Sequence, residues 1–66
     1  MTDEVLDRKE TSELVQVAEG TLRSWDHRNY GPPSFRVGGR VRYRRSSVER
    51  WLAEQEQAGA ERRGVA

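Results

Sequence analysis

The sequence predicts a mostly α-helical domain with a two-stranded β-hairpin, in the order helix, turn, helix, hairpin, helix. Three observations predict this order. Two short amphipathic stretches flank a break at residues 16–18, an alternating run at 34–44 is centred on two glycines, and apolar residues recur at helical spacing from Val48 to Leu52. With 66 residues and no cysteine, we expect one domain with a small core and no disulfide.

The first helix is predicted from about Arg8 to Val15. Asp7 and Glu10 form a capping box, in which the Asp7 carboxylate accepts from the Glu10 backbone N–H and the Glu10 side chain reaches back. Leu14 is expected to face inward. Residues 1–5 are acidic and are predicted to be a flexible start, so the folded domain is placed at residues 6–57.

The second helix is predicted from about Glu19 to Asn29. Leu22 and Trp25 lie three residues apart and form its buried stripe. The run Gly31-Pro32-Pro33 ends the helix, because glycine suits the left-handed position after a helix and proline cannot continue one.

The hairpin is predicted over residues 34–44, where Gly38 and Gly39 supply the positive φ angles of a tight turn. The odd positions are apolar: Phe35, Val37, Val41 and Tyr43. The even positions are arginines: Arg36, Arg40, Arg42 and Arg44. Since neighbouring residues of a strand point to opposite faces, we expect an apolar face on the helices and a guanidinium face outside. Four arginines on one face would repel one another, and a bound polyanion would relieve that repulsion. The alternative is an exposed edge hairpin that uses its charge to resist aggregation.

The third helix is predicted to begin at Ser46, which forms a second capping box with Glu49, and to run to about Gln57. Val48, Trp51 and Leu52 are its inward residues. Residues 58–66 are small and polar without a period, which predicts a disordered tail. Trp25 and Trp51 both lie on apolar faces, so core packing is expected for them rather than stacking on bases.

Charge is sorted along the chain although the net charge is only +1. Residues 1–22 carry two basic and six acidic side chains. Residues 23–50 carry eight arginines and two acidic side chains. An arginine's flat fork of donors fits phosphate oxygens and guanine edges, so the middle of the chain is the candidate nucleic-acid-binding segment.

The composition excludes several other classes of functional site and of protein. One histidine and no cysteine leave no plausible metal site, and Ser24, Asp26 and His27 form no catalytic arrangement. Nothing in the sequence predicts an enzyme, a cofactor or a small-molecule ligand. No apolar segment is long enough for a membrane or a signal peptide, so a cytoplasmic location is expected.

Residues 6–52 resemble the small winged helix-turn-helix proteins of the excisionase family, relatives of the DNA-binding domain of MerR-type regulators. The matching segments are 6–17 for the first helix and turn, 20–25 for the recognition helix, and 35–44 with 47–52 for the wing and closing helix. Two residues depart from the family pattern. Gln16 replaces a common turn glycine and so must adopt a tight conformation, and Ala18 replaces a Ser-like helix cap.

The resemblance implies a recognition helix in the major groove of duplex DNA and a wing in or beside the adjacent minor groove. The implied recognition-helix residues are Glu19, Gly20, Thr21, Arg23, Ser24, His27 and Arg28. The implied wing residues are Arg36, Gly38, Gly39, Arg40, Arg42 and Arg44. Arg23 is the expected guanine contact and Arg40 the expected minor-groove contact. Glu19 either accepts from cytosine or favours the helix N-terminus, and His27 reads as a surface residue.

Three functions fit these observations. The first, implied by the resemblance, is an excisionase-like recombination directionality factor of a phage or mobile element. It would bind beside an attachment site, as one or several cooperating copies, bend the DNA and assist an integrase. The second is a small winged-helix transcription regulator. The third is a protein-interaction adaptor whose basic wing meets an acidic partner.

Overall fold

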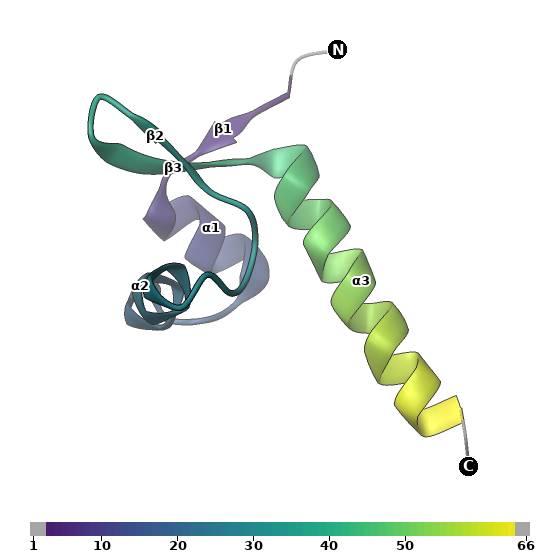
Figure 1. The fold of residues 1–66 in the computed structure, drawn as a ribbon. Helices are drawn as coiled ribbons and strands as arrows, with labels where there is room; N and C mark the ends of the chain where they lie inside the picture. The colour runs from purple at the N-terminus through teal and green to yellow at the C-terminus, as the bar shows by residue number, and fades with distance from the viewer. Residues whose placement is uncertain (1–2, 65–66) are drawn as a thin grey trace.

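The computed structural model describes residues 3–64 of the chain. Its elements run in the order β1 (Val5–Leu6), α1 (Arg8–Val15), α2 (Glu19–His27), β2 (Phe35–Val37), β3 (Arg40–Arg44) and α3 (Arg45–Gly64). The helices α1 and α2 lie together beneath a small sheet, and α3 leaves the end of β3 and extends beyond the rest of the fold towards the C-terminus (Figure 1). This is the predicted three-helix architecture with a β-hairpin, which we call the wing (residues 35–44).

The residues that cap α1 and precede α2 follow the sequence prediction. The Asp7 carboxylate accepts from the Glu10 backbone N–H at 2.7 Å, and the Glu10 carboxylate accepts from the Asp7 N–H at 2.9 Å, so the capping box is confirmed. Gln16 ends α1 in the left-handed region, with φ 64°. Ala18 precedes α2 without a side-chain cap, as its chemistry requires. The α2 helix ends at His27, two residues earlier than predicted.

The core is small and centred on the sheet. Tyr43 of β3 is 2% exposed and clusters with the buried side chains of Leu6 and Val48. Four partly buried side chains pack around that cluster: Leu14, Val15, Val41 and Leu52. The core therefore takes residues from β1, α1, β3 and α3, so none of these elements can bury its apolar side alone.

The two tryptophans pack on one another beside this core. Trp25 of α2 and Trp51 of α3 are half-buried, with ring centroids 5.6 Å apart. Tyr30, half of whose surface is exposed, meets both rings edge-on, at 5.2 and 6.2 Å. This cluster joins α2 to α3, so the tryptophans pack within the protein at its flank rather than in its centre.

Replacing Gly31 by alanine is expected to destabilise the domain by at least about 1–2 kcal/mol. Gly31 has φ 88°, and a Cβ there would lie 2.8 Å from the Cε3 atom of Trp25. Gly20 is the matched control, because a Cβ at this helical position meets nothing within 4 Å. Gly20→Ala is expected to raise the melting temperature and Gly31→Ala to lower it. Equal shifts in thermal unfolding would contradict this account.

The wing is confirmed as a hairpin, but its two faces are not the ones predicted. Gly38 and Gly39 have φ 57° and 82°, as a tight two-residue turn requires. The register pairs Phe35 with Arg42 and Val37 with Arg40, so odd positions of β2 share a face with even positions of β3. The prediction of separate apolar and guanidinium faces was therefore wrong.

The hairpin faces follow from this register. The face towards the core carries Val41 and Tyr43, and the pairing of Arg36 with Val41 puts Arg36 on that same side. The outer face of the wing carries apolar and guanidinium groups together: Phe35, Val37, Arg40, Arg42 and Arg44. The guanidinium of Arg44 lies 5.7 Å from the centroid of the Phe35 ring, as expected for two residues on one face.

The start of the chain is more ordered than predicted. Val5 and Leu6 form β1, which pairs antiparallel with Arg44 and Tyr43 and makes the sheet three-stranded in the order β1-β3-β2. We call residues 3–6 the N-terminal strap. Residues 3–5 are part of the predicted flexible, acidic start; here the backbone of Val5 pairs with Arg44 of β3, and the Glu4 carbonyl accepts from the Arg45 backbone N–H. Residues 1–2 of that prediction lie outside the described residues.

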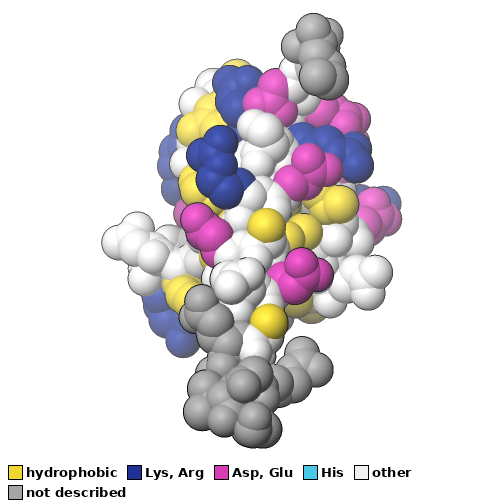
Figure 2. Space-filling model, turned by 90° about the vertical axis from the view of Figure 1, so that its right-hand side faces the viewer, with side chains coloured by type: hydrophobic (Ala, Val, Ile, Leu, Met, Phe, Trp, Pro, Cys, Tyr) yellow, Lys and Arg dark blue, Asp and Glu magenta, His cyan; other side chains and the backbone are white. Residues whose placement is uncertain are grey.

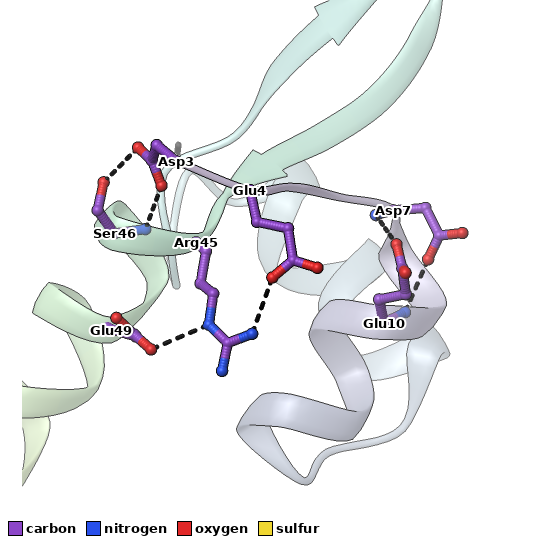
Figure 3. Close-up of polar contacts among 7 residues, drawn as sticks. All are labelled: Asp3, Glu4, Asp7, Glu10, Arg45, Ser46 and Glu49. Atoms are coloured by element: carbon purple, nitrogen blue, oxygen red, sulfur yellow. Dashed lines mark hydrogen bonds and ion pairs between the residues drawn. The ribbon is translucent and has the colours of Figure 1, made fainter. Parts of the chain in front are cut away.

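The third helix begins and ends differently from the prediction. It starts at Arg45, directly after β3, and the predicted capping box of Ser46 and Glu49 is replaced by a cap from the N-terminal strap. The Ser46 backbone N–H and hydroxyl donate to the Asp3 carboxylate at 3.1 and 2.7 Å (Figure 3). The helix continues to Gly64, so residues 58–64 are helical where a disordered tail was predicted. Residues 65–66 lie outside the described residues.

The N-terminal strap and the start of α3 are also joined by ion pairs. The Arg45 guanidinium donates to Glu4 at 2.8 Å and to Glu49 at 3.1 Å (Figure 3). These hydrogen bonds raise the pKa of Arg45 above its ordinary value. The Arg45 backbone N–H also donates to the Glu4 carbonyl at 2.8 Å. Within residues 3–64 no helix is apolar enough over its length to cross a bilayer.

Acid is expected to loosen the N-terminal strap. Hydrogen bonds from Ser46 and the nearby Arg44 guanidinium lower the pKa of Asp3 below its ordinary 3.8. The stabilisation is therefore complete above pH 3.8 and is lost as the pH falls through the lower folded-state value. Melting temperatures of the wild type and Asp3→Asn should differ at neutral pH and converge below pH 3.8. Glu13→Gln, an exposed helical control, should track the wild type throughout.

Candidate nucleic-acid interface

A groove of about 380 Å³ lies where the starts of α1 and α2 meet the wing. We call it the basic groove. Its lining residues are Asp7, Arg8, Lys9, Glu19, Arg23, Arg40, Val41 and Arg42. They come from the start of α1, from α2 and from β3, and the fold brings them together because β3 lies over α1 while α1 packs on α2. Five of the eight side chains are cationic.

Four of the predicted site residues meet in the basic groove. Glu19 and Arg23, one helical turn apart, come from α2, and Arg40 and Arg42 come from β3. Arg42 is half-buried, and its Nη1 atom donates to the Val41 carbonyl at 2.7 Å, which holds the guanidinium along its own strand. An arginine of α2 and two wing arginines therefore share one surface.

The other predicted recognition-helix residues lie outside that lining. Gly20, Ser24, His27 and Arg28 are exposed on or at the end of α2, and Thr21 is half-buried. Leu22, 1% exposed, fixes which side of α2 faces the protein. The exposed side of α2 therefore carries the polar set that the sequence assigned to base and phosphate contacts.

Ion pairing separates the arginines of the wing into two groups. Arg36 lies 3.8 Å from the Asp26 carboxylate, and Arg44 lies 3.4 Å from that of Asp3. Neither lines the basic groove. Arg40 and Arg42 have no ion pair among residues 3–60. Hence the two wing arginines of the groove keep their charge available to an external anion, while the other two are already paired within the chain.

Unpaired cations extend beyond the wing. The cationic side chains without an ion pair among residues 3–60 are Lys9, Arg23, Arg28, Arg40, Arg42 and Arg50. Four of these six line the basic groove. The face that carries α3 is different, because acidic and basic side chains are interspersed over it (Figure 2). The unpaired positive charge is therefore gathered at the groove.

Asp26 holds the elements around the groove in place. Its carboxylate lies 3.6 Å from an Arg8 nitrogen and 3.8 Å from an Arg36 nitrogen, and it accepts from the Ser34 hydroxyl at 3.0 Å. It thus links α2 to α1 and to β2. The Nε atom of Arg8 is buried without a hydrogen-bond partner within the described part of the chain. Asp26 therefore contacts residues of α1, of β2 and of the segment that leads into β2.

Sequence reasoning missed Arg8 and Lys9 as groove residues. The capping-box pattern identifies them only as the first residues of α1. No local pattern marks them, because their approach to Arg40 depends on how α1 packs beneath β3. Among the described residues, no three His, Cys, Asp or Glu side chains are grouped so as to hold a metal ion.

Comparison with models of known protein families identifies the family of this chain. Residues 5–56 match the model of the helix-turn-helix domain family. The chain belongs to that family. Searches of the curated proteins and of the solved structures found no match. The match makes DNA the expected partner of this helix-turn-helix protein.

Proposed function

We propose that this protein is a sequence-specific duplex-DNA-binding protein of the excisionase type. The observation that carries the proposal is the shared position of Arg23 on α2 with Arg40 and Arg42 on the wing, all without ion pairs in residues 3–60. The helix α2 enters the major groove, where Arg23 donates two hydrogen bonds to a guanine edge. The wing reaches the neighbouring minor groove, where Arg40 lies deepest.

The remaining predicted residues take supporting roles in this proposal. Ser24, Thr21 and Arg28 contact phosphates beside the recognition helix, and Gly38 and Gly39 let the wing backbone approach closely. Arg36 and Arg44 reach phosphates only by exchanging their carboxylate partners, Asp26 and Asp3. Lys9 joins the phosphate contacts from the start of α1. Such contacts position the protein, whereas Arg23 supplies the sequence reading.

In this role the protein performs no chemistry of its own. It binds beside an attachment site in the cytoplasm of a bacterial host, bends the duplex, and so assists the integrase of a phage or mobile element. Several copies side by side would increase the bend. Bending is favourable when the wing gains minor-groove contacts that straight DNA does not offer.

A small transcription regulator is the second candidate, and one observation favours it. The helix α3 continues to Gly64, although the sequence predicted a disordered tail from residue 58, and its residues 53–60 are largely exposed. An exposed helix offers a surface to a second copy of the chain. A two-fold dimer would read two half-sites related by inversion.

Selection from a random duplex pool at physiological salt, followed by sequencing, tests both candidates. Short direct repeats at helical spacing would support the excisionase-type proposal, because several copies would then lie on one side of the duplex. An inverted repeat would move the assignment to a transcription regulator. A pool without enrichment would contradict both, and would leave an acidic protein partner as the function to test.

A further inference from the structure

Val37, next to the turn of the wing, is an apolar residue whose exposure to solvent is not explained by the packing of the fold. Its side chain is 54% exposed, and the core cluster with its flanking residues does not include it. Two other large apolar side chains are exposed among the described residues. Of these, Tyr30 packs on two tryptophans, and Val5 lies on the short strand β1 at the other end of the sheet.

The surroundings of Val37 are cationic. It is directly opposite Arg40 across the two-residue turn, and the register puts Arg42 on the same face. Neither arginine has an ion pair among residues 3–60. The register thus puts a β-branched side chain on the same face as two guanidinium groups that have no ion pair among residues 3–60. These residues lie next to the turn of the wing, which extends away from the helices (Figure 1).

We infer that Val37 is a DNA contact, packing against the deoxyribose wall of the groove that Arg40 enters. The inference rests on the proposed function. Sugar C–H groups are the apolar surface of a duplex, and phosphates flank them on both sides. A valine between two guanidinium groups matches that pattern, since the apolar group meets sugar while the cations meet phosphate. An apolar protein surface would instead leave both guanidinium groups unpaired on binding, which is costly.

The contact has two measurable properties. Burying the extra methyl group of valine relative to threonine changes the affinity by about fourfold, the factor that matches 0.8 kcal/mol for one methylene-sized group. Because the contact releases no counterions, the slope of log affinity against log salt stays the same. An arginine contact with a phosphate behaves differently, since losing it makes that negative slope shallower by about 0.9.

The experiment measures the fluorescence anisotropy of a short labelled A·T-rich duplex over a salt series, with thermal unfolding of each variant. Val37→Thr keeps the β-branched shape and is expected to bind about fourfold more weakly with an unchanged salt slope and melting temperature. Val37→Ile keeps the apolar group and is expected to bind at least as well as the wild type. Val5→Thr, a control of similar exposure (47%) on β1, is expected to change nothing.

The possible results separate the inference from the proposed function. If the wild type binds and Val37→Thr binds equally well, the inference is overturned and the proposed function stands. Equal losses in Val37→Thr and Val37→Ile would also overturn it, because shape rather than apolar contact would then matter. A folded wild type that binds no duplex at any salt concentration would overturn both the inference and the proposed function.

Discussion

Replacing Arg23 and Arg40 together by alanine is expected to weaken binding to the selected DNA site by about thirtyfold or more. Each arginine that makes a bidentate contact with a base contributes about 1–3 kcal/mol. Both side chains line the basic groove and neither has an ion pair among residues 3–60, so neither alanine leaves a buried charge without its partner. Equilibrium binding to the selected duplex at several salt concentrations measures the loss.

The two single variants are expected to change DNA binding in different ways. Arg23→Ala is expected to relax sequence preference at one or two base pairs, and Arg40→Ala to weaken binding more at A·T-rich flanks than at G·C-rich ones. Arg50→Ala is the matched control, since Arg50 is an exposed arginine of α3 that has no ion pair among residues 3–60 and lies outside the groove. It removes the same charge. If Arg50→Ala weakens binding as much as Arg23→Ala, net charge rather than the groove determines affinity.

Local signals in the sequence predicted the elements well. The capping box at Asp7, the left-handed Gln16 and the turn at Gly38 and Gly39 depend on residues within a few positions of one another. Backbone sterics and short-range hydrogen bonds decide such features almost regardless of context. The order of the helices and the wing could therefore be derived from periodicity and turn chemistry alone.

Long-range pairing decided what the sequence could not show. Asp3 caps α3 across 43 residues, and no pattern around Ser46 reveals a donor or acceptor at that distance. The wing faces depend on the parity of the register, because a two-residue turn pairs an odd position with an even one. Reading β2 and β3 as one alternating run ignored that reversal.

The candidate site also combines features that the sequence predicted with features that depend on the fold. The alternation and the glycine turn marked Arg40 and Arg42, which line the groove, but equally marked Arg36 and Arg44, which pair with Asp26 and Asp3. Sequence identifies which residues carry charge. It does not identify which charges are already balanced by the fold, and that balance separates a binding surface from a structural ion pair.

Replacing Tyr43 by alanine is expected to unfold most of the protein at room temperature. Tyr43 is the largest fully buried side chain and lies between Leu6 and Val48. Truncation of a buried aromatic residue to alanine typically costs about 3–5 kcal/mol. At about 0.05–0.15 kcal/mol per residue, a domain of 66 residues has roughly 3–10 kcal/mol of stability in total. Circular dichroism and chemical denaturation measure the loss.

Tyr43→Phe is the matched control, because it keeps the ring and should remain folded. Duplex DNA adds a second, independent measurement on the alanine variant. If the folded domain binds DNA and the unfolded chain does not, a hundredfold excess of duplex over its dissociation constant restores about 2.7 kcal/mol. The helix content of Tyr43→Ala should then recover as selected duplex is added and not as an unselected one is added. Recovery with both would mean that charge alone folds the chain, and that its specificity does not reside in the recognition helix.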